Sequence, residues 1–441
     1  MSDYRALFEG KKITVMGLGL LGRAIGDIKF LAEQGAQVTV TDMKTEADLA
    51  ESIAQLKGYP NIIFHLGGHA EEDFTQCDMV IKAAGVRLDS PYIAAARVAD
   101  VPVYMSTALF AKYAIEAGAT IVGITGTRGK STVTQMIYHV LQKTGKQVFL
   151  GGNVRGVSTL AILPDVHAGD IAVLELDSWQ LQGFGDLGIS PQVAVFTNLM
   201  PDHQNYYADM DEYFTDKTNI FTHQKPGDVL VVGQQIAERI AALPADRHGV
   251  VPPALPSDWH MCIPGMHNRE NASLAAGALR VLGLSEVEIK DGLESFEGVE
   301  GRLQFIGEIH GVKIYNDNNA TTPEATIAAL RALHVGFTKP HIVLIMGGAD
   351  KGLDMNGLLY EIAQSCKRVI LLAGSGTDRI APIMADYSIF DDLGAAVREA
   401  VASASDDDVI LFSPAFASFG MFKNEYDRND QFMKLIKENT L

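Results

Sequence analysis

The chain has 441 residues, 47% of them hydrophobic, so it is long enough for two or three domains that each bury a core. Its formal net charge of −18 and the lack of a basic stripe argue against nucleic-acid or anionic-membrane partners. The three cysteines show no metal-ligand spacing and no run of about 18 apolar residues occurs, so we expect a cytoplasmic protein with reduced thiols.

The first segment carries a dinucleotide-binding fingerprint. The motif Gly17-Leu-Gly19-Leu-Leu-Gly22 follows a predicted strand and precedes a predicted helix, and Asp42 ends the next strand, where NAD-binding proteins place a ribose-binding acid. This pattern indicates a crevice for a diphosphate and does not identify the ligand. Gly85, at the end of a later strand, either lines that crevice or is only a turn glycine. The predicted strands are residues 12–16, 37–41, 62–66 and 79–82.

The strongest chemical signal is the stretch Gly123-Ile-Thr-Gly-Thr-Arg-Gly-Lys-Ser-Thr132. An apolar run at residues 120–124 predicts a buried strand before it, and helical periodicity follows it until Gly145. This order is the layout of a phosphate-binding loop, in which backbone amides and a helix N-terminus surround phosphate oxygens. We expect Lys130 to reach the terminal phosphates and Ser131 to ligate Mg²⁺, although the glycine spacing is one residue longer than the standard motif.

Polar residues follow two buried strands downstream of this loop. The strand at residues 170–174 ends in Glu175, and a carboxylate at that place commonly holds Mg²⁺. The strand at residues 192–196 is followed by Asp202-His203. Because histidine is not a favoured Mg²⁺ ligand, spacing alone leaves His203 open as a structural or a functional residue.

Two further features of the central segment have ambiguous patterns. Lys217 lies in a predicted helix at residues 210–221, and the pattern alone is typical of a solvent-exposed side chain. Asn268 and Asn271 stand just before an alanine-rich helical stretch. Their side chains could cap that helix or reach a nucleotide, and the sequence does not decide between these roles.

The last segment predicts a third α/β layer. A hairpin at residues 303–315 is followed by a helix that opens at Pro323, and strands and helices then alternate. Polar loops follow three of these strands, which favours one shared cleft over three unrelated turns. The three strands are residues 341–346, 368–373 and 408–412.

Taken in order, these motifs resemble the Mur ligase family over about residues 13 to 433. The matching patterns are T-G-T-x-G-K-S-T, L-E-L-x-S-x-Q-L, D-H, the lysine at 217, G-x-H-N-x-x-N-A, G-R, N-D, G-G-x-D-K and S-P-A-x-A-S. The family uses this variant of the phosphate loop, which accounts for its spacing. The short first domain and the ending S-P-A-F-A-S…F-K-N resemble the members that add D-glutamate, and the Asn-Pro-Arg motif usual in diaminopimelate-adding members is missing.

The resemblance implies a three-domain α/β protein. Its parts would be a Rossmann-like UDP-substrate domain (1–106), a central ATP-binding parallel sheet with the phosphate loop (107–300) and a C-terminal Rossmann-like amino-acid domain (301–441). The implied activity is ATP-dependent addition of D-glutamate to UDP-N-acetylmuramoyl-L-alanine through an acyl phosphate, in cytoplasmic peptidoglycan precursor synthesis. It would use ATP and two Mg²⁺ ions, act as a monomer, and have no nucleic-acid or membrane partner.

The resemblance also implies roles for individual residues. The catalytic residues would be Lys130, Glu175, His203 and Lys217. The metal ligands would be Ser131 and Glu175 for one ion, and His203 and Lys217, as a carbamate, for the other. The ATP contacts would be Gly126, Thr127, Arg128, Gly129, Lys130, Ser131, Thr132, Asn268, Asn271, Arg302 and Asp317. The UDP-substrate contacts would be Leu20, Leu21, Asp42, Lys44, Gly85, Asn153 and Gln180, and the amino-acid contacts Lys351 and Ser418.

Several positions depart from the residues usual in the family. Asn319 replaces a lysine near the reacting carboxylates, and Arg128 replaces an asparagine and could supply the missing charge. Asp177 replaces a serine, and Asn205-Tyr206 replaces Asp-Arg. Apart from Arg128, these changes leave the ATP-binding residues intact, and they bear on which amino acid is used.

Three other functions stay open at this point. A sister ligase, Mur-type or similar to folylpolyglutamate synthase, would add another amino acid such as L-glutamate. An NAD-dependent oxidoreductase would explain only the fingerprint at Gly17 to Gly22. A non-catalytic nucleotide-binding module is opposed by the intact set Lys130, Ser131, Glu175, His203 and Lys217.

Overall fold

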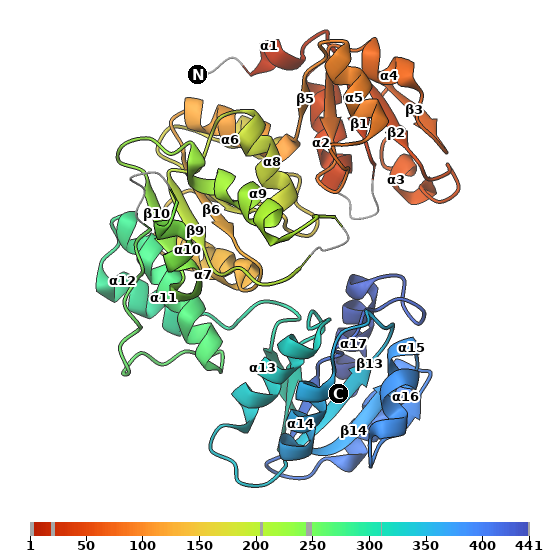
Figure 1. Cartoon of the computed structure of the whole chain (residues 1–441), viewed down its shortest axis with the longest axis vertical. Coiled ribbons are helices and arrows are strands. Elements are labelled where there is room, and N and C mark those ends of the chain that lie inside the picture. Colours follow the sequence, from red (N-terminus) through yellow and green to blue (C-terminus); the bar gives the residue numbers. More distant parts are fainter. Residues whose placement is uncertain (1–3, 19–22, 203–205, 244–248, 310, 440–441) are drawn as a thin grey trace. The chain divides into compact units, whose positions relative to one another are not determined.

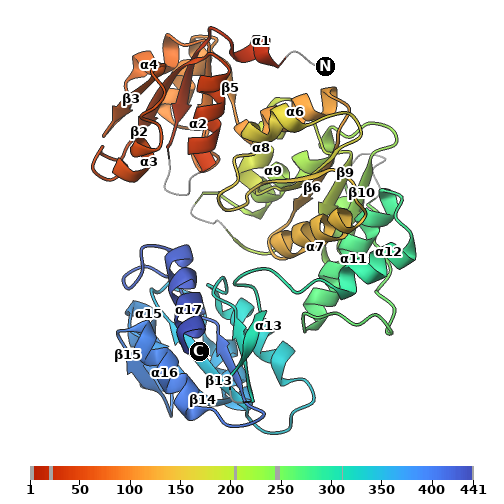
Figure 2. The same ribbon diagram turned by 180° about the vertical axis from the view of Figure 1, so that it is seen from behind.

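The computed structural model describes residues 4–18, 23–202, 206–243, 249–309 and 311–439. The chain forms two compact units, the first made of Met1–Pro253 with Ala272–Ile289 and the second of Ala254–Asn271 with Lys290–Leu441. Two sheets lie in the first unit and one in the second, and helices flank each of them (Figures 1 and 2). The α/β class with three largely parallel sheets is therefore confirmed.

The first sheet has five parallel strands in the order β3-β2-β1-β4-β5. Its central strands β1 and β4 are apolar and buried, as expected for parallel strands covered on both faces. The order reverses between β1 and β4, which is where such sheets bind ligands at the carboxyl ends of their strands. The strands are β1 (Lys12–Met16), β2 (Gln37–Asp42), β3 (Ile62–Leu66), β4 (Met79–Lys82) and β5 (Val103–Tyr104).

The second sheet is also parallel, in the order β10-β9-β6-β8-β7. Its middle strand β6 leads into α7 (Lys130–Lys143), so the loop between them opens at the carboxyl edge, between the ends of β8 and β9. The strands are β6 (Thr120–Thr125), β7 (Val148–Gly152), β8 (Ile171–Glu175), β9 (Val193–Phe196) and β10 (Val229–Val232).

The third sheet has the order β11-β12-β16-β13-β14-β15, in which the β11–β12 hairpin is antiparallel and the other pairs are parallel. Side chains of α13 (Pro323–His334) and α14 (Asn356–Ser365) pack on one face, and those of α16 (Leu393–Ser403) and α17 (Glu425–Asn439) on the other. The strands are β11 (Gln304–Ile309), β12 (Val312–Asn316), β13 (Ile342–Gly347), β14 (Cys366–Leu372), β15 (Ser388–Phe390) and β16 (Val409–Phe412).

Helices supply the remaining layers of both units. Among the described ranges, none of them is both long and apolar enough to cross a lipid bilayer. They are α1 (Arg5–Phe8), α2 (Arg23–Glu33), α3 (Ala50–Ala54), α4 (Glu71–Thr75), α5 (Pro91–Val98), α6 (Ser106–Glu116), α8 (Ser178–Asp186), α9 (Met210–Thr222), α10 (Gln234–Ala241), α11 (Met266–Val281), α12 (Glu286–Glu294) and α15 (Ser375–Ile380), with 3₁₀ turns at Leu160–Asp165 and Ala381–Ile383.

Candidate functional site

The loop between β6 and α7 has the backbone that a phosphate-binding loop needs. Gly129 precedes α7 with φ = +83°, in the left-handed region that favours glycine. Gly126 has φ = +140°, and a Cβ atom there would overlap the hydroxyl of Thr197. Both glycines are therefore required by the geometry, and they bring the loop to the N-terminus of α7, where anions bind.

The end of β9 holds the loop in this shape. The Thr197 hydroxyl and the Asn198 side-chain amide donate hydrogen bonds to the Arg128 carbonyl oxygen, at 2.6 and 3.2 Å. The Arg128 backbone N–H in turn donates to Asn198 Oδ1 at 2.9 Å. Sequence reasoning gave no role to Thr197 or Asn198, although a polar pair directly after a buried strand is the signal that could have found them.

Lys130 folds back across the loop. Its Nζ donates to the carbonyl oxygens of Gly126 and Thr127, at 3.0 and 3.1 Å. Ser131 and Thr132 follow in the first turn of α7. The lysine amine and the Ser131 hydroxyl thus lie on the segment where phosphate oxygens would bind.

Lys217 is buried in this same site, which corrects the expectation of a solvent-exposed side chain. It is 1% exposed, and its Nζ donates to the Gly126 carbonyl oxygen at 2.9 Å and to Thr125 Oγ1 at 3.3 Å. The amine also lies 4.7 Å from the centre of the Tyr213 ring. Burial, with the nearby charge of Lys130, lowers the pKa of Lys217 well below its usual value, which favours the neutral amine.

Glu175 ends β8 at the same sheet edge as the loop. It is 5% exposed and lies in register with Ile124 of β6 and Gly152 of β7. Its carbonyl oxygen accepts a hydrogen bond from the Asn153 N–H at 2.7 Å. A side chain on Gly152, which has φ = +84°, would collide with that carbonyl, so glycine is needed for the close approach.

The described residues do not bring three His, Cys, Asp or Glu side chains together as a metal site. His203 lies outside the described residues, as do Leu20 and Leu21. A hydroxyl from Ser131 and a carboxylate from Glu175 are nevertheless oxygen donors of the type that Mg²⁺ prefers, and Mg²⁺ usually takes its other ligands from water and phosphate.

A cavity of about 400 Å³ lies in the first unit and is open at the ends of β1 and β4. Three of the residues implied for the UDP substrate, Gly85, Asn153 and Gln180, line it. Lys82 also lines it, is 2% exposed and donates to the Val86 carbonyl oxygen at 2.8 Å, and burial lowers its pKa to about 8.

Asp42 and Lys44, also implied for the UDP substrate, are not among the residues that line this cavity. The Asp42 carboxylate accepts hydrogen bonds from the backbone N–H groups of Leu18 and Lys44, each at 2.9 Å. In this structure Asp42 therefore fixes the turn that follows β1.

Gln180 and Asp177 form a capping box at the start of α8. Asp177 Oδ1 accepts from the Gln180 N–H at 2.7 Å, and Gln180 Oε1 accepts from the Asp177 N–H at 3.2 Å. The Gln180 amide also donates to Thr107 Oγ1 at 3.1 Å. Asp177, which departs from the usual serine, keeps the N-cap role that a serine would have.

In the second unit, Asp317 is a buried acid at the end of β12. Its two carboxylate oxygens accept from the Leu303 N–H at 2.9 Å and from the Ser413 hydroxyl at 2.8 Å. Burial raises its pKa to about 7, and the opposing effects of these hydrogen bonds and of Arg302 are smaller. Asn319, nearby in the chain, accepts from Asn318 Nδ2 at 3.1 Å and donates to the Glu300 carbonyl oxygen at 3.3 Å.

The polar loops after β13, β14 and β16 lie together, as the sequence predicts. Ala349 and Ala417 form an antiparallel bridge, and the Gly376 N–H donates to the Gly348 carbonyl oxygen at 2.9 Å. The bridge brings the segments that carry Lys351 and Ser418 side by side. Lys351 is exposed and donates to Thr321 Oγ1 at 3.0 Å, whereas Ser418 is buried.

Asn268 and Asn271 lie within α11, which begins at Met266, so the alternative that they cap this helix is wrong. Both are buried, and Asn268 Nδ2 donates to the Pro264 carbonyl oxygen at 2.7 Å. A role in nucleotide binding stays a prediction.

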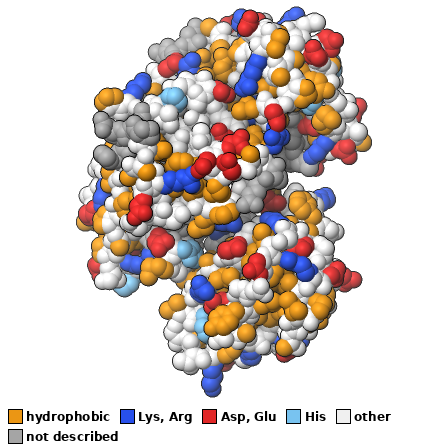
Figure 3. Space-filling view, in the orientation of Figure 1, with side chains coloured by type: hydrophobic (Ala, Val, Ile, Leu, Met, Phe, Trp, Pro, Cys, Tyr) orange, Lys and Arg blue, Asp and Glu red, His pale blue; other side chains and the backbone are white. Residues whose placement is uncertain are grey.

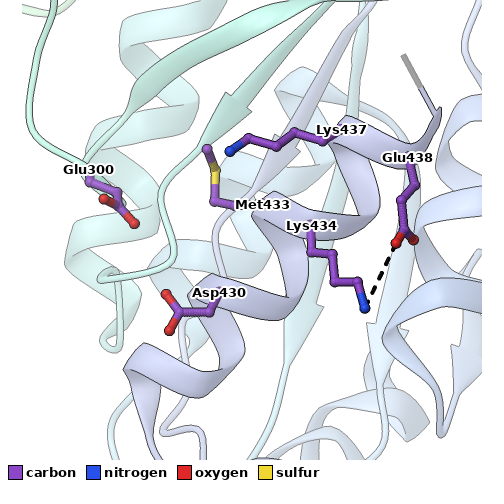
Figure 4. A pocket seen from close by; sticks show the side chains of 6 residues that line it. All are labelled: Glu300, Asp430, Met433, Lys434, Lys437 and Glu438. Atoms are coloured by element: carbon purple, nitrogen blue, oxygen red, sulfur yellow. Dashed lines mark ion pairs between the residues drawn. The ribbon is translucent and has the colours of Figure 1, made fainter. Parts of the chain in front are cut away.

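Another cavity, of about 490 Å³, opens on the second unit between Glu300 and α17 (Figure 4). Its lining mixes acidic and basic side chains with Met433 and includes none of the residues implied for substrates. Lys and Arg side chains are scattered among acidic ones on the molecular face drawn in Figure 3.

Comparison with known proteins gives three family matches that together span most of the chain. Residues 11–105 match the Mur ligase MurD-like N-terminal domain, residues 124–251 the Mur ligase middle domain, and residues 301–416 the Mur ligase glutamate ligase domain.

Curated relatives align over nearly the full length. A UDP-N-acetylmuramoylalanine–D-glutamate ligase of Roseiflexus sp. (strain RS-1) is 36% identical, over 98% of this chain and 99% of its own. The protein of the same name from Borreliella afzelii (strain PKo) is 33% identical, over 96% of both chains.

Solved structures share the fold at lower identity. UDP-N-acetylmuramate-alanine ligase MurC from Thermotoga maritima gives a TM-score of 0.63 at 19% identity, over 97% of this chain and 99% of the other. MurF ligase from the same organism, in complex with ADP, gives 0.60 at 16% identity, over 100% and 99% of the two chains.

Proposed function

Because the chain belongs to the Mur ligase family, we propose that it is the ATP-dependent ligase that joins D-glutamate to UDP-N-acetylmuramoyl-L-alanine in peptidoglycan precursor synthesis. The observation that carries this proposal is 33–36% identity, over nearly the whole chain, to ligases with this activity in their name. It is supported by the phosphate loop, which accepts a hydrogen bond from buried Lys217 and lies at the same sheet edge as buried Glu175. The oxidoreductase alternative does not explain the presence of the phosphate loop or of the third sheet.

The proposed reaction has two steps. An oxygen of the alanyl carboxylate attacks the γ-phosphorus of ATP, the bond to the β-phosphate oxygen breaks, and ADP leaves. The amine of D-glutamate then attacks the carbonyl carbon of the acyl phosphate and loses a proton. The bond between that carbon and the bridging oxygen breaks, and inorganic phosphate leaves with its electron pair. In the first step an anionic carboxylate approaches an anionic phosphate, and in the second step negative charge develops on the carbonyl oxygen. The site must therefore supply positive charge and oriented N–H groups.

The phosphate loop supplies these groups. Lys130, which now donates to two loop carbonyls, would exchange them for oxygens of the β- and γ-phosphates. The remaining contacts to ATP are proposed as implied by the family: Gly126, Thr127, Arg128, Gly129, Ser131, Thr132, Asn268, Asn271, Arg302 and Asp317.

Ser131 and Glu175 are the residues that we propose for a first Mg²⁺ ion. When bound, the metal would neutralise phosphate charge during the approach of the substrate carboxylate. A second ion would be held by His203 and by Lys217 after carbamylation. The neutral Lys217 amine can attack CO₂, forming an N–C bond and releasing one proton, and the product is an anionic carbamate with two oxygen donors in place of the neutral amine.

Substrate contacts are proposed on both units. Gly85, Asn153 and Gln180 line a cavity large enough for part of the UDP-linked substrate, and Leu20, Leu21, Asp42 and Lys44 are proposed beside them. Lys351 and Ser418 are proposed to bind the carboxylates of D-glutamate. We propose functional domains at residues 1–106, 107–300 and 301–441, and a monomer that works in the cytoplasm, where ATP and UDP-linked precursors are made.

A phosphate-release assay tests the proposal. The protein is incubated with ATP, Mg²⁺ and UDP-N-acetylmuramoyl-L-alanine, with D-glutamate or L-glutamate in parallel reactions. We expect phosphate release and a product heavier by one glutamyl residue only with the D isomer. Release with L-glutamate or another amino acid would identify a sister ligase, and a change in absorbance at 340 nm with NADH would instead support an oxidoreductase.

A further inference from the structure

A buried arginine outside the proposed contacts joins two loops of the second unit. Arg428 of α17 is 1% exposed, and its guanidinium donates three hydrogen bonds. Nε and Nη2 donate to Asn318 Oδ1 and to the Asn318 carbonyl oxygen, at 2.8 and 2.9 Å, and Nη1 donates to the Phe416 carbonyl oxygen at 3.3 Å. The acceptors belong to the loop after β12 and to the loop after β16.

Asn429 extends this network along the first of these loops. Its Oδ1 accepts from Asn316 Nδ2 at 2.8 Å, and its own Nδ2 donates to Glu300 Oε1 at 2.5 Å. Asn316 Oδ1 accepts from the Asn318 N–H at 3.0 Å. The residues on both sides of Asp317 are therefore held by consecutive residues of α17.

The second loop contains a residue in an uncommon backbone conformation. Ala415, next to Phe416, has φ = +62°, a left-handed value that is uncommon for a residue other than glycine. The Ala415 N–H donates to the Ala320 carbonyl oxygen at 2.8 Å, and Ser413 donates to Asp317. Such strain persists only where surrounding contacts fix the backbone, and Arg428 is one of those contacts.

We propose that Arg428, assisted by Asn429, is a positioning residue that fixes the nucleotide contact Asp317 and the amino-acid contact Ser418 relative to each other. This inference rests on the proposed function, which gives those two residues their ligands. A structural role alone would be filled at less cost by an apolar side chain, because burying a cation whose three hydrogen-bond acceptors are neutral oxygens is unfavourable. The planar guanidinium holds its N–H groups in fixed directions, so it can donate to carbonyl oxygens of both loops at the same time.

The experiment compares Arg428→Met and Arg428→Lys with the wild type, and uses Lys434→Met as the matched control. Lys434 lies on the exposed side of the same helix and pairs only with Glu438 in the view of Figure 4. For each variant, KM is measured for ATP, for the amino acid and for the UDP-linked substrate, together with kcat and the unfolding temperature.

We expect Arg428→Met to raise KM for ATP and for the amino acid about tenfold or more, because both loops lose a charged hydrogen-bond donor. KM for the UDP-linked substrate should stay within about twofold, since the residues proposed for it lie in the first unit. Arg428→Lys keeps the positive charge but lacks the planar guanidinium with its several N–H donors. Its KM values should therefore fall between those of Arg428→Met and the wild type. Lys434→Met should match the wild type.

The inference is overturned if either Arg428 variant keeps all three KM values and loses only thermal stability or folded yield. It is also overturned if all three KM values rise together. Arg428→Lys decides the question where Arg428→Met does not fold. Wild-type turnover with D-glutamate tests the proposed function separately, and the KM comparison applies to whichever amino acid the wild type uses.

Discussion

At the scale of single residues, two lysines share one acceptor in the phosphate loop. Lys130 and Lys217 both donate to the carbonyl oxygen of Gly126, at 3.0 and 2.9 Å. Burial first, and then repulsion by the nearby Lys130 ammonium, lowers the pKa of Lys217 well below its usual value. The lowered pKa favours a neutral Lys217 amine, which can then take part in other chemistry.

We predict that Lys130→Ala abolishes turnover. The variant removes the side chain that would offset charge on the transferring phosphoryl group, and loss of one such contact costs roughly 10²–10³ in rate. Lys143→Ala, at the exposed other end of α7, is the control and should keep wild-type kcat. Retention of more than about a tenth of the wild-type rate by Lys130→Ala would contradict the assignment.

We predict that Lys217 carries a carbamate in the active enzyme. Incubation with ¹³C-bicarbonate should give one carbamate carbon resonance that Lys217→Arg lacks, because the neutral buried amine is the form that adds CO₂. The sign with pH follows from the lowered pKa: acidification protonates the amine and should remove both the resonance and the activity. An unchanged spectrum in Lys217→Arg would show that the carbon belongs to another group.

At the scale of helices and strands, the residues proposed for function are concentrated where strands end. The phosphate loop follows β6, Glu175 ends β8, and the pair Thr197-Asn198 follows β9, all at one edge of the second sheet. Parallel strands make this arrangement possible, because their carboxyl ends and the helix N-termini that follow them gather on the same side. Burial of the strands fixes the backbone, and the loops supply the chemistry.

We predict that serine, the residue usual in the family at position 177, preserves the stability that the α8 capping box provides. Asp177→Ser keeps a side-chain oxygen for the Gln180 N–H, whereas Asp177→Ala leaves that donor without its partner and should cost about 1 kcal/mol. Thermal unfolding of the two variants measures the difference. Equal unfolding temperatures for serine and alanine at this position would mean that the cap contributes nothing to stability.

Much of this architecture could be predicted from the sequence, and the exceptions have physical reasons. Buried parallel strands such as β1 and β6 are continuous apolar runs, so they were found with nearly the observed bounds. The helical pattern alone indicates an exposed Lys217, because periodicity does not reveal a helix that packs over a loop distant in sequence, and only the family resemblance points to the site. The sequence pattern places Asn268 before α11, which in fact begins at Met266, because helix termini are the least certain feature of a pattern.

At the scale of the whole molecule, stability is expected to depend on pH through buried acids as well as through net charge. The formal charge of −18 at pH 7 implies self-repulsion that weakens as carboxylates take up protons. Asp317 adds a specific contribution, because burial raises its pKa in the folded protein from 3.8 to about 7. The folded second unit therefore binds a proton, between these two values, that the unfolded chain does not bind.

The sign of this effect leads to the last prediction. Stabilisation by protonated Asp317 is complete below about pH 4 and is lost as pH rises through about 7. Between pH 5 and pH 8, the free energy of unfolding of the wild type should therefore fall by about 3 kcal/mol more than that of Asp317→Asn. The chain has two tryptophans, and Trp259 is buried in the second unit. In a Trp179→Phe background its fluorescence reports unfolding of that unit in urea at pH 5 and pH 8. Parallel pH profiles for the aspartate and asparagine forms would show that Asp317 does not hold the proton, and that net charge alone governs the response.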